Sequence, residues 1–235
     1  MSKFIVTDSF WELFPQAKIG VVLLKDFQSQ EQSPQLIIEI LKESNELAKN
    51  YLVEANFSDN AEIQVYRKAY QKFKTKKGAR SSIEALLKRV SNNKPVGSIN
   101  PLVDIYNAAS LRYALPVGAE DSDTFEGDLR LEITEGGDEF QLIESSKNQP
   151  TLAGELCYRD DKGAVCRCLN WRDGERTMIT NKTKNAFIVI ELLDSNRIES
   201  LQLALDFIEK NAQNYLKGDS SQAILDITHP YLIIN

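Results

Sequence analysis

Asn107 is the residue of this sequence that most suggests chemistry, because it interrupts the apolar stretch PLVDIYNAASLRYALPVGAED at residues 101–121. An asparagine amide both donates and accepts hydrogen bonds, and burying one without a partner costs about 1–3 kcal/mol. The small side chains of Ala108, Ala109 and Ser110 leave room beside it for a ligand or another chain. The amide therefore either binds a ligand or ties its helix to a loop, and the spacing alone favours neither.

A second polar group lies in CRCLNWRDGERTMIT at residues 166–180. In an alternating strand, the two cysteines and Asn170 would face one side, and Arg167 and Trp171 the other. An Asp-Gly turn follows. The polar residues after Trp171 that could line a pocket are Arg172, Arg176, Thr177 and Thr180. The alternative, which these residues alone slightly favour, is an ordinary hairpin with one buried cysteine face.

The third group is basic. Residues 67–94 contain ten lysines and arginines and one acid, whereas the remainder contains 18 basic and 33 acidic residues, so a segment of +9 lies in a background of −15. Such an asymmetry is typical of proteins that bind phosphate chains. The side chains that we expect to contact RNA are Lys72, Lys74, Lys76, Lys77, Lys88 and Arg89. A solvated helical face, with its aromatic residues in the core, is the simpler alternative.

Other kinds of chemistry find little support in the sequence. It has no glycine-rich nucleotide loop and no G-x-S-x-G motif. Its single histidine, His229, precedes a proline near the end of the chain, which favours a structural or surface role. The three cysteines and this histidine lack the spacing of zinc ligands, so we expect neither a metal nor another cofactor.

The elements that must position these residues fall into two groups. Helices are expected at 33–52, 59–74, 81–90, from Pro101 to just before Pro116, and at 195–217. Strands are expected at 18–27, 128–134, 139–145, 153–160, 163–171 and 186–193, with a last strand or docked tail at 222–228. Residues 116–127 look like a loop, and Gly118 helps to end the preceding helix. This segregation predicts an α+β fold.

The length of 235 residues suits one domain with a substantial core. We therefore predict a single domain over residues 1–235, in which residues 1–57 form an N-terminal strand and helix extension. No apolar run reaches the roughly 20 residues of a membrane span, so we expect no membrane association. The first residues lack the layout of a signal peptide, and the odd number of cysteines fits a reducing compartment, so we expect the cytoplasm.

Four stretches, taken together, resemble a known family: RSSIEALLKRV, NPLVDIYNAASLRYALPVGAED, GELCYRD and CRCLNWRDGERTMITNKTKNAFIVIE. They resemble the B3/B4 domain, the editing domain of the bacterial phenylalanyl-tRNA synthetase β chain, and more closely its free-standing relatives. The resemblance covers about residues 60–215. It implies a helical layer packed on a β-sandwich of unusual topology, and hydrolysis of the ester that joins a wrong amino acid to the 3′ end of tRNA.

The resemblance also assigns positions. Asn107 falls on the family asparagine that lines the editing pocket, and Pro116 and Asp121 match the family pattern. Gly118 stands where the synthetase has a histidine. Glu120 replaces an aromatic residue, and Met178 stands where a glutamate is expected.

The function implied is a free-standing domain that deacylates mischarged tRNA in trans. Its pocket would lie between residues 100–121 and 166–180, with Asn107 bound to the amino acid or the water. The residues expected to bind substrate are Arg80, Asn107, Gly118, Asp121, Asn170, Arg172, Thr177 and Thr180. The alternatives are a non-catalytic RNA- or tRNA-binding module with the same fold, and a protein that binds a free amino acid or nucleoside.

Overall fold

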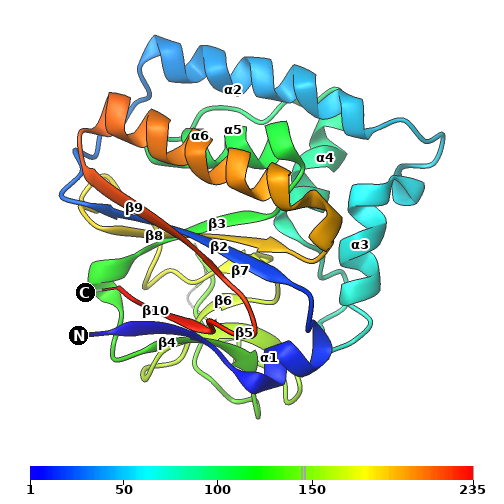
Figure 1. Cartoon of the computed structure of the whole chain (residues 1–235), viewed down its shortest axis with the longest axis vertical. Coiled ribbons are helices and arrows are strands. Elements are labelled where there is room, and N and C mark those ends of the chain that lie inside the picture. The colour runs from blue at the N-terminus through cyan, green and yellow to red at the C-terminus, as the bar shows by residue number, and fades with distance from the viewer. Residues whose placement is uncertain (144, 146, 235) are drawn as a thin grey trace.

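The chain folds into three layers, with helices on one sheet and that sheet on a second one (Figure 1). The computed structural model describes residues 1–143, 145 and 147–234. A four-stranded sheet has the order β3 (Val117–Asp121), β8 (Ala186–Leu192), β2 (Lys18–Lys25) and β9 (Asp219–Leu225). The order of the six-stranded sheet is β10 (Tyr231–Ile233), β1 (Lys3–Val6), β4 (Leu129–Ile133), β5 (Leu156–Arg159), β6 (Ala164–Arg167) and β7 (Arg172–Asp173). The predicted fold class is confirmed.

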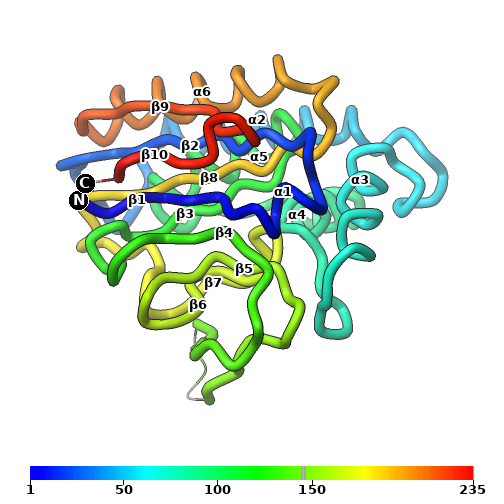
Figure 2. The backbone as a smooth tube through the Cα atoms, turned by 60° about the horizontal axis from the view of Figure 1, so that its bottom comes forward, coloured from blue at the N-terminus to red at the C-terminus, as the bar shows by residue number. Residues whose placement is uncertain are grey.

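The four-stranded sheet has a hydrophobic core on each face. Because successive side chains of a strand point to opposite faces, the residues of one strand belong alternately to the two cores. Val22 and Leu24 of β2 pack with the helical layer, made of α2 (Gln35–Leu47), α5 (Pro101–Tyr113) and α6 (Ile198–Leu216). Ile19 and Val21 of the same strand pack with the six-stranded sheet. The tube in Figure 2 shows the two sheets lying over one another beneath α6. The remaining helices are α1 (Asp8–Leu13), α3 (Ala61–Ala69) and α4 (Ser82–Ser91).

Local sequence signals explain where two helices begin. Ser81 caps α4, since its Oγ accepts a hydrogen bond from the Glu84 N–H at 3.4 Å. Asn100 caps α5, since its Oδ1 accepts from the Val103 N–H at 3.0 Å, and Pro101 occupies the first turn. Among the described residues, none of the helices has both the length and the hydrophobicity that crossing a bilayer requires.

The end of α5 differs from the expectation for Gly118. The helix stops at Tyr113, and the residue in the left-handed conformation is Ala114, with φ 46°. Gly118 belongs instead to β3, which lies in the stretch expected to be a loop. The five residues of β3 pair with β8 in antiparallel register, so a partner distant in sequence determines this strand.

Two other expected elements are shorter than predicted. Helix α3 ends at Ala69, because the chain then turns and the Lys74 N–H donates to the Gly154 carbonyl at 2.8 Å. In the described part of 139–145, Gln141 and Leu142 form only single β-bridges, while residue 144 lies outside the described residues. The first strand, β1, was not expected; it pairs with β4 and with β10.

Candidate functional site

The candidate site lies where the edge strand β3 meets the turn between β6 and β7. The strand expected over 163–171 stops at Arg167, because Cys168 and Asn170 both adopt positive φ, 55° and 50°. Left-handed backbone at two residues other than glycine is uncommon and costly. The alternation therefore ends there, and the turn directs Asn170 between the two sheets instead of along one face of a strand.

Asn170 lies directly against Gly118. A β-carbon built at position 118 would be 2.0 Å from Asn170 Oδ1, so only glycine fits beside this carboxamide. The carboxamide nitrogen donates to both carboxyl oxygens of Glu191, at 2.7 Å each. The Tyr158 hydroxyl donates to Glu191 Oε1 at 2.5 Å. Burial raises the pKa of Glu191 to about 8. This network holds the carboxamide in one orientation.

Three potential ligand groups meet on the other side of Asn170. Glu120, Cys166 and Asp173 each offer an atom that lies within 4.8 Å of the other two. Burial, and then the Asp173 carboxyl nearby, raise the pKa of Glu120 well above its usual range. Burial also raises the pKa of Tyr106, on α5, and the charges of Asp173 and Glu120 add to this effect. The Tyr106 hydroxyl is therefore within electrostatic range of this cluster.

Asn107 itself is half-buried on α5, and its amide makes no hydrogen bond with any described residue. The alternative in which the amide ties the helix to a loop therefore has no contact to support it. Solvent reaches part of the side chain, so the amide can bind a ligand without first breaking an internal bond. Its role remains a prediction.

The other expected substrate residues of this region follow the edge of β3. Asp121 lies at the end of the strand, where its N–H donates to the Thr177 carbonyl at 2.7 Å and its Oδ2 accepts from the Thr183 hydroxyl at 2.7 Å. Thr180 turns back locally and accepts from the Lys182 N–H at 3.1 Å. The Thr177 side chain is fully buried, and its hydroxyl has no partner among the described residues. Asp121 and Thr180 thus stabilise the loop beside the cluster.

Arg80 and Arg172 lie outside this cluster, of which Glu120 and Cys166 are buried and Asp173 is half-buried. Arg80 is exposed and lines a hollow of about 480 Å³ together with Arg67 and Tyr70. The exposed Arg172 stacks over Trp171, with its guanidinium 5.2 Å from the ring centroid. Neither arginine forms an ion pair with a described residue. Both are available to a phosphate.

The basic segment divides between packed and exposed side chains. The Lys72 amine donates to the Leu13 carbonyl at 2.8 Å, and Lys88 lies 4.5 Å from the Phe57 ring centroid. Arg67 binds Glu84 at 2.6 Å and borders a second hollow, of about 720 Å³, which Lys88 also lines. The aromatic side chain of Tyr66 is in the core, so it is not available to stack on a base.

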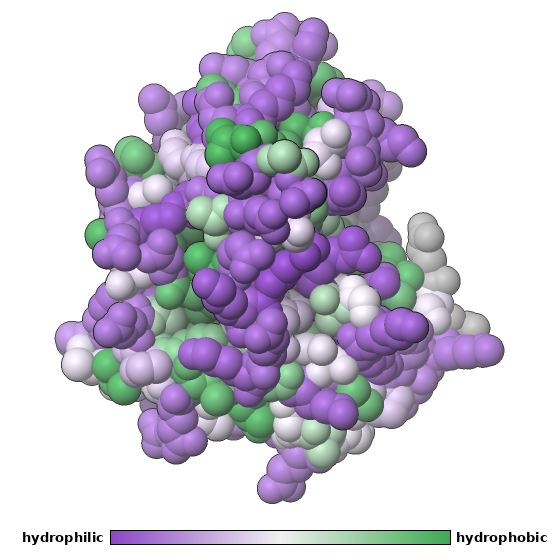
Figure 3. Space-filling model, turned by 90° about the vertical axis from the view of Figure 1, so that its right-hand side faces the viewer, coloured by the Kyte–Doolittle hydropathy of each residue, from purple (hydrophilic) through white to green (hydrophobic). Residues whose placement is uncertain are grey.

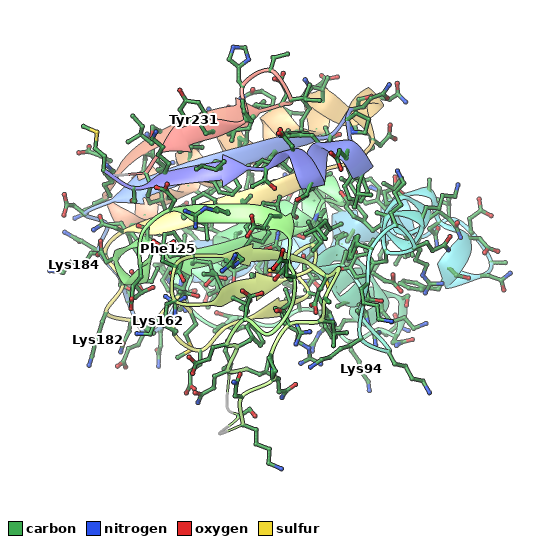
Figure 4. The ribbon with its side chains drawn as sticks, turned by 90° about the horizontal axis from the view of Figure 1, so that it is seen from below. Lys94, Phe125, Lys162, Lys182, Lys184 and Tyr231 are labelled. Carbon is green, nitrogen blue, oxygen red and sulfur yellow. The ribbon has the colours of Figure 1, made fainter. Side chains whose placement is uncertain are left out.

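Most of the remaining basic residues that were expected to contact RNA face solvent. Lys74, Lys77 and Arg89 are exposed, and Lys76 is half-buried. The side of the molecule that carries α3 is largely hydrophilic (Figure 3). Seen from below, Lys94 at the end of the basic segment projects on the opposite side from Lys162, Lys182 and Lys184 (Figure 4). Basic groups therefore flank the molecule on two sides.

The sequence analysis missed the carboxyl groups of the site. Glu191 could have been found, because it is an acid inside the apolar run AFIVIELL. Glu120 could have been found only if residues 117–121 had been identified as a strand. The side chains of a strand alternate between its two faces, which places Glu120 on the same face as Gly118. Asp173 was taken for part of a turn.

Comparisons with known proteins give one consistent picture. Residues 65–228 match the family model described as the B3/4 domain. Over 120 residues the chain is 27% identical to the phenylalanine–tRNA ligase beta subunit of Fusobacterium nucleatum subsp. nucleatum, a match that covers 51% of this chain and 15% of that subunit. A crystal structure of an N-terminal fragment of the phenylalanyl-tRNA synthetase beta-subunit from Pyrococcus horikoshii aligns with a TM-score of 0.50 at 11% identity, covering 92% of this chain and 49% of the fragment. This chain thus spans less than half of either relative.

Proposed function

Because the chain belongs to the B3/4 domain family, we propose that it binds the 3′ end of an aminoacyl-tRNA and hydrolyses the ester of a mischarged amino acid in trans. The observation that carries this proposal is the half-buried amide of Asn107, which has no partner among the described residues. This residue is also the one that falls on the family's pocket asparagine. We place the activity in the cytoplasm, where aminoacyl-tRNA is used.

The chemistry requires no protein nucleophile. An aminoacyl ester is already activated, so placing a water and stabilising the charge that develops on the carbonyl oxygen are sufficient. The Asn107 amide group can donate to that oxygen while its carbonyl accepts from the water or from the amino group of the substrate. This mechanism agrees with a sequence that has one histidine, near its end.

The exposed basic residues would bind the phosphates of the tRNA. Arg80, Arg172 and the lysines of 72–77 would neutralise its backbone, with Lys88 and Arg89 extending the surface along α4. Binding through such residues positions the substrate without selecting its sequence. Selection of the amino acid would then fall to the polar groups near β3.

The amino acid accepted would differ from that of the synthetase. Gly118 replaces the synthetase histidine, and the space beside it is filled by Asn170. Met178, in place of the expected glutamate, lies opposite Glu120 across a β-bridge. A carboxyl group is thus present in this part of the site, but it belongs to the other strand. We therefore assume no particular amino acid.

Deacylation of a panel of mischarged tRNAs tests the proposal. We expect at least one member to lose its amino acid faster with the protein than without it. Asn107→Ala should reduce this rate by about 100- to 1000-fold, the range for removing one positioned hydrogen-bond donor. Asn214→Ala, an exposed asparagine on α6, is the matched control and should keep the full rate. No deacylation of any tRNA would overturn the enzymatic proposal.

A non-catalytic tRNA-binding module is the second candidate, and the Gly118–Asn170 contact favours it. In this chain a carboxamide fixed by Glu191 fills the place beside the position where the synthetase has a histidine. A module of this kind would bind tRNA with an affinity that falls steeply with salt, and would show no turnover. The same panel, measured for binding as well as deacylation, distinguishes the two functions.

A further inference from the structure

We propose that Glu120, Cys166 and Asp173 form a binding site for a divalent cation of the zinc class. The three residues come from three elements, β3, β6 and β7, which meet at the edge of the four-stranded sheet. One thiol and two carboxyl groups are a donor set suited to a borderline-soft cation, because zinc accepts both sulfur and oxygen ligands. The site is additional to the proposed deacylation, which needs no metal.

The geometry fits a tetrahedral cation. Tetrahedral zinc with one sulfur and one oxygen ligand places these atoms about 3.5 Å apart. Cys166 Sγ lies 3.3 Å from Asp173 Oδ1 and 3.7 Å from Asn170 Oδ1. The Asn170 carboxamide oxygen is therefore positioned as a fourth donor. The ligand atoms of Glu120, Cys166 and Asp173 all lie within 4.8 Å of one another.

An unsatisfied polar atom provides an independent indication of a ligand. Glu120 is only 4% exposed, and its Oε2 makes no hydrogen bond with any described residue. Leaving a buried carboxyl oxygen without a partner costs free energy that a bound cation would recover. The fully buried Thr177 hydroxyl makes no hydrogen bond of ordinary geometry within the described chain either, although it lies close enough to the Glu120 carboxyl to oppose part of the rise in the pKa of that group.

Glu120 and Asp173 lack the positive charge that some buried acids of this protein have. Unlike the buried acids Asp104 and Glu191, Glu120 keeps a carboxyl oxygen without a hydrogen bond among the described residues. Arg167 neutralises Glu155, and Arg176 binds Asp160 at 2.7 and 2.8 Å. For Glu120 and Asp173, no lysine or arginine of the described residues lies within ion-pairing distance. A buried acid is ordinarily paired, bound to a metal, or kept neutral by a raised pKa, as Glu120 is without a cation. A divalent cation would supply the missing charge and displace the thiol proton of Cys166.

Surrounding contacts hold one donor in place. Both oxygens of Glu191 accept from the Asn170 nitrogen, which directs the carboxamide oxygen towards Cys166. Such outer contacts commonly orient metal ligands. The chain spacing gave no sign of the site, because its residues come together only in the folded protein: β6 pairs with β7, and Glu120 of β3 forms a β-bridge with Met178, which follows β7 in the chain.

Metal binding to the isolated protein tests this inference without tRNA, so its outcome does not depend on the proposed activity. The protein is stripped with a chelator, titrated with Zn²⁺ alone, desalted and analysed for zinc. We expect one zinc per chain and a higher melting temperature with excess zinc. Co²⁺ in place of Zn²⁺ should give the near-ultraviolet absorption of a thiolate–cobalt bond.

Variants assign the binding to these residues. Cys166→Ser should abolish the cobalt–thiolate absorption and weaken zinc binding by more than about 100-fold, because even outer contacts contribute about 10- to 100-fold. Asp173→Asn and Glu120→Gln, which keep side-chain shape, should weaken zinc binding comparably, and they keep the test open if Cys166→Ser does not fold. The control Cys157→Ser changes another buried thiol, on β5, and should bind normally. Absence of stoichiometric zinc in the unmodified protein, or unchanged binding in the folded cluster variants, would overturn the proposal.

Discussion

The carboxamide of Asn170 occupies the space that any side chain at position 118 would need, since a β-carbon there would lie 2.0 Å from its Oδ1. Gly118 lies in the four-stranded sheet and Asn170 in the turn that joins β6 to β7 of the other sheet, and Glu191 prevents the carboxamide from moving aside freely. Gly118 thus serves close packing between the sheets.

Substitution of Gly118 by alanine should therefore destabilise the protein by about 1–3 kcal/mol through overpacking. Equilibrium denaturation measures this change. Gly97→Ala is the matched control, because nothing lies within 4 Å of the added β-carbon and its effect should stay within about 0.5 kcal/mol. In an Asn170→Ala background the Gly118 substitution should cost less. Equal costs in both backgrounds would show that this contact is not the cause.

The buried ion pair of Arg167 and Glu155 should be the most sensitive pair to break. Arg167 Nε and Nη2 donate to the two oxygens of Glu155 at 2.6 and 2.5 Å, and both side chains are almost completely buried. Glu155→Ala leaves the guanidinium without its counter-charge and should cost about 3–5 kcal/mol. Glu84→Ala, which breaks the partly exposed pair with Arg67, should cost considerably less in the same denaturation measurement.

Asp160 should make stability depend on pH at the acid end. Burial acts to raise the pKa of its carboxyl, but hydrogen bonds from Arg176 and from the Glu126 N–H outweigh this and hold the pKa below its usual range. In the unfolded chain an aspartate has a pKa of about 3.9. The stabilisation that the Asp160 carboxylate gives the folded protein is therefore complete above that pH, and it is lost as the pH falls through the lower pKa of the folded state.

Asp160→Asn should therefore lower the free energy of unfolding at neutral pH by about 1.5–3 kcal/mol, the range for hydrogen bonds to a charged group. The variant should also lose less of its stability than the unmodified protein when the pH falls below about 4. Thermal unfolding of both proteins between about pH 2 and 7 measures the difference. The neighbouring Asp161, whose side chain is 61% exposed, provides the control Asp161→Asn, with little change expected. Parallel pH profiles for Asp160→Asn and the unmodified protein would contradict this assignment.

The parts of the fold that could be predicted from the sequence are those with local causes. The caps at Ser81 and Asn100 need only residues within one turn of their helices, and the helix starts expected at residue 81 and at Pro101 agree with them. Strand β3 was missed because Val117–Asp121 contains a glycine and two acids, and only its pairing with β8 makes it a strand. Likewise, nothing in the residue types of Cys168 and Asn170 indicates positive φ. The cluster of Glu120, Cys166 and Asp173 depends on both strand β3 and this turn, so the sequence alone could not predict it.

The exposed side chains of Lys74 and Lys77 should govern the salt dependence of tRNA binding. Each phosphate that a lysine neutralises contributes roughly 0.7–0.9 to the slope of log K against log salt. Lys74→Ala/Lys77→Ala should therefore weaken tRNA binding and lower this slope by about 1–2. Titrations at several salt concentrations measure both quantities. The control pair Lys42→Ala/Lys210→Ala removes the same charge from exposed positions on α2 and α6. Since overall charge would affect both variants equally, the same change in both would show that tRNA does not contact residues 74–77.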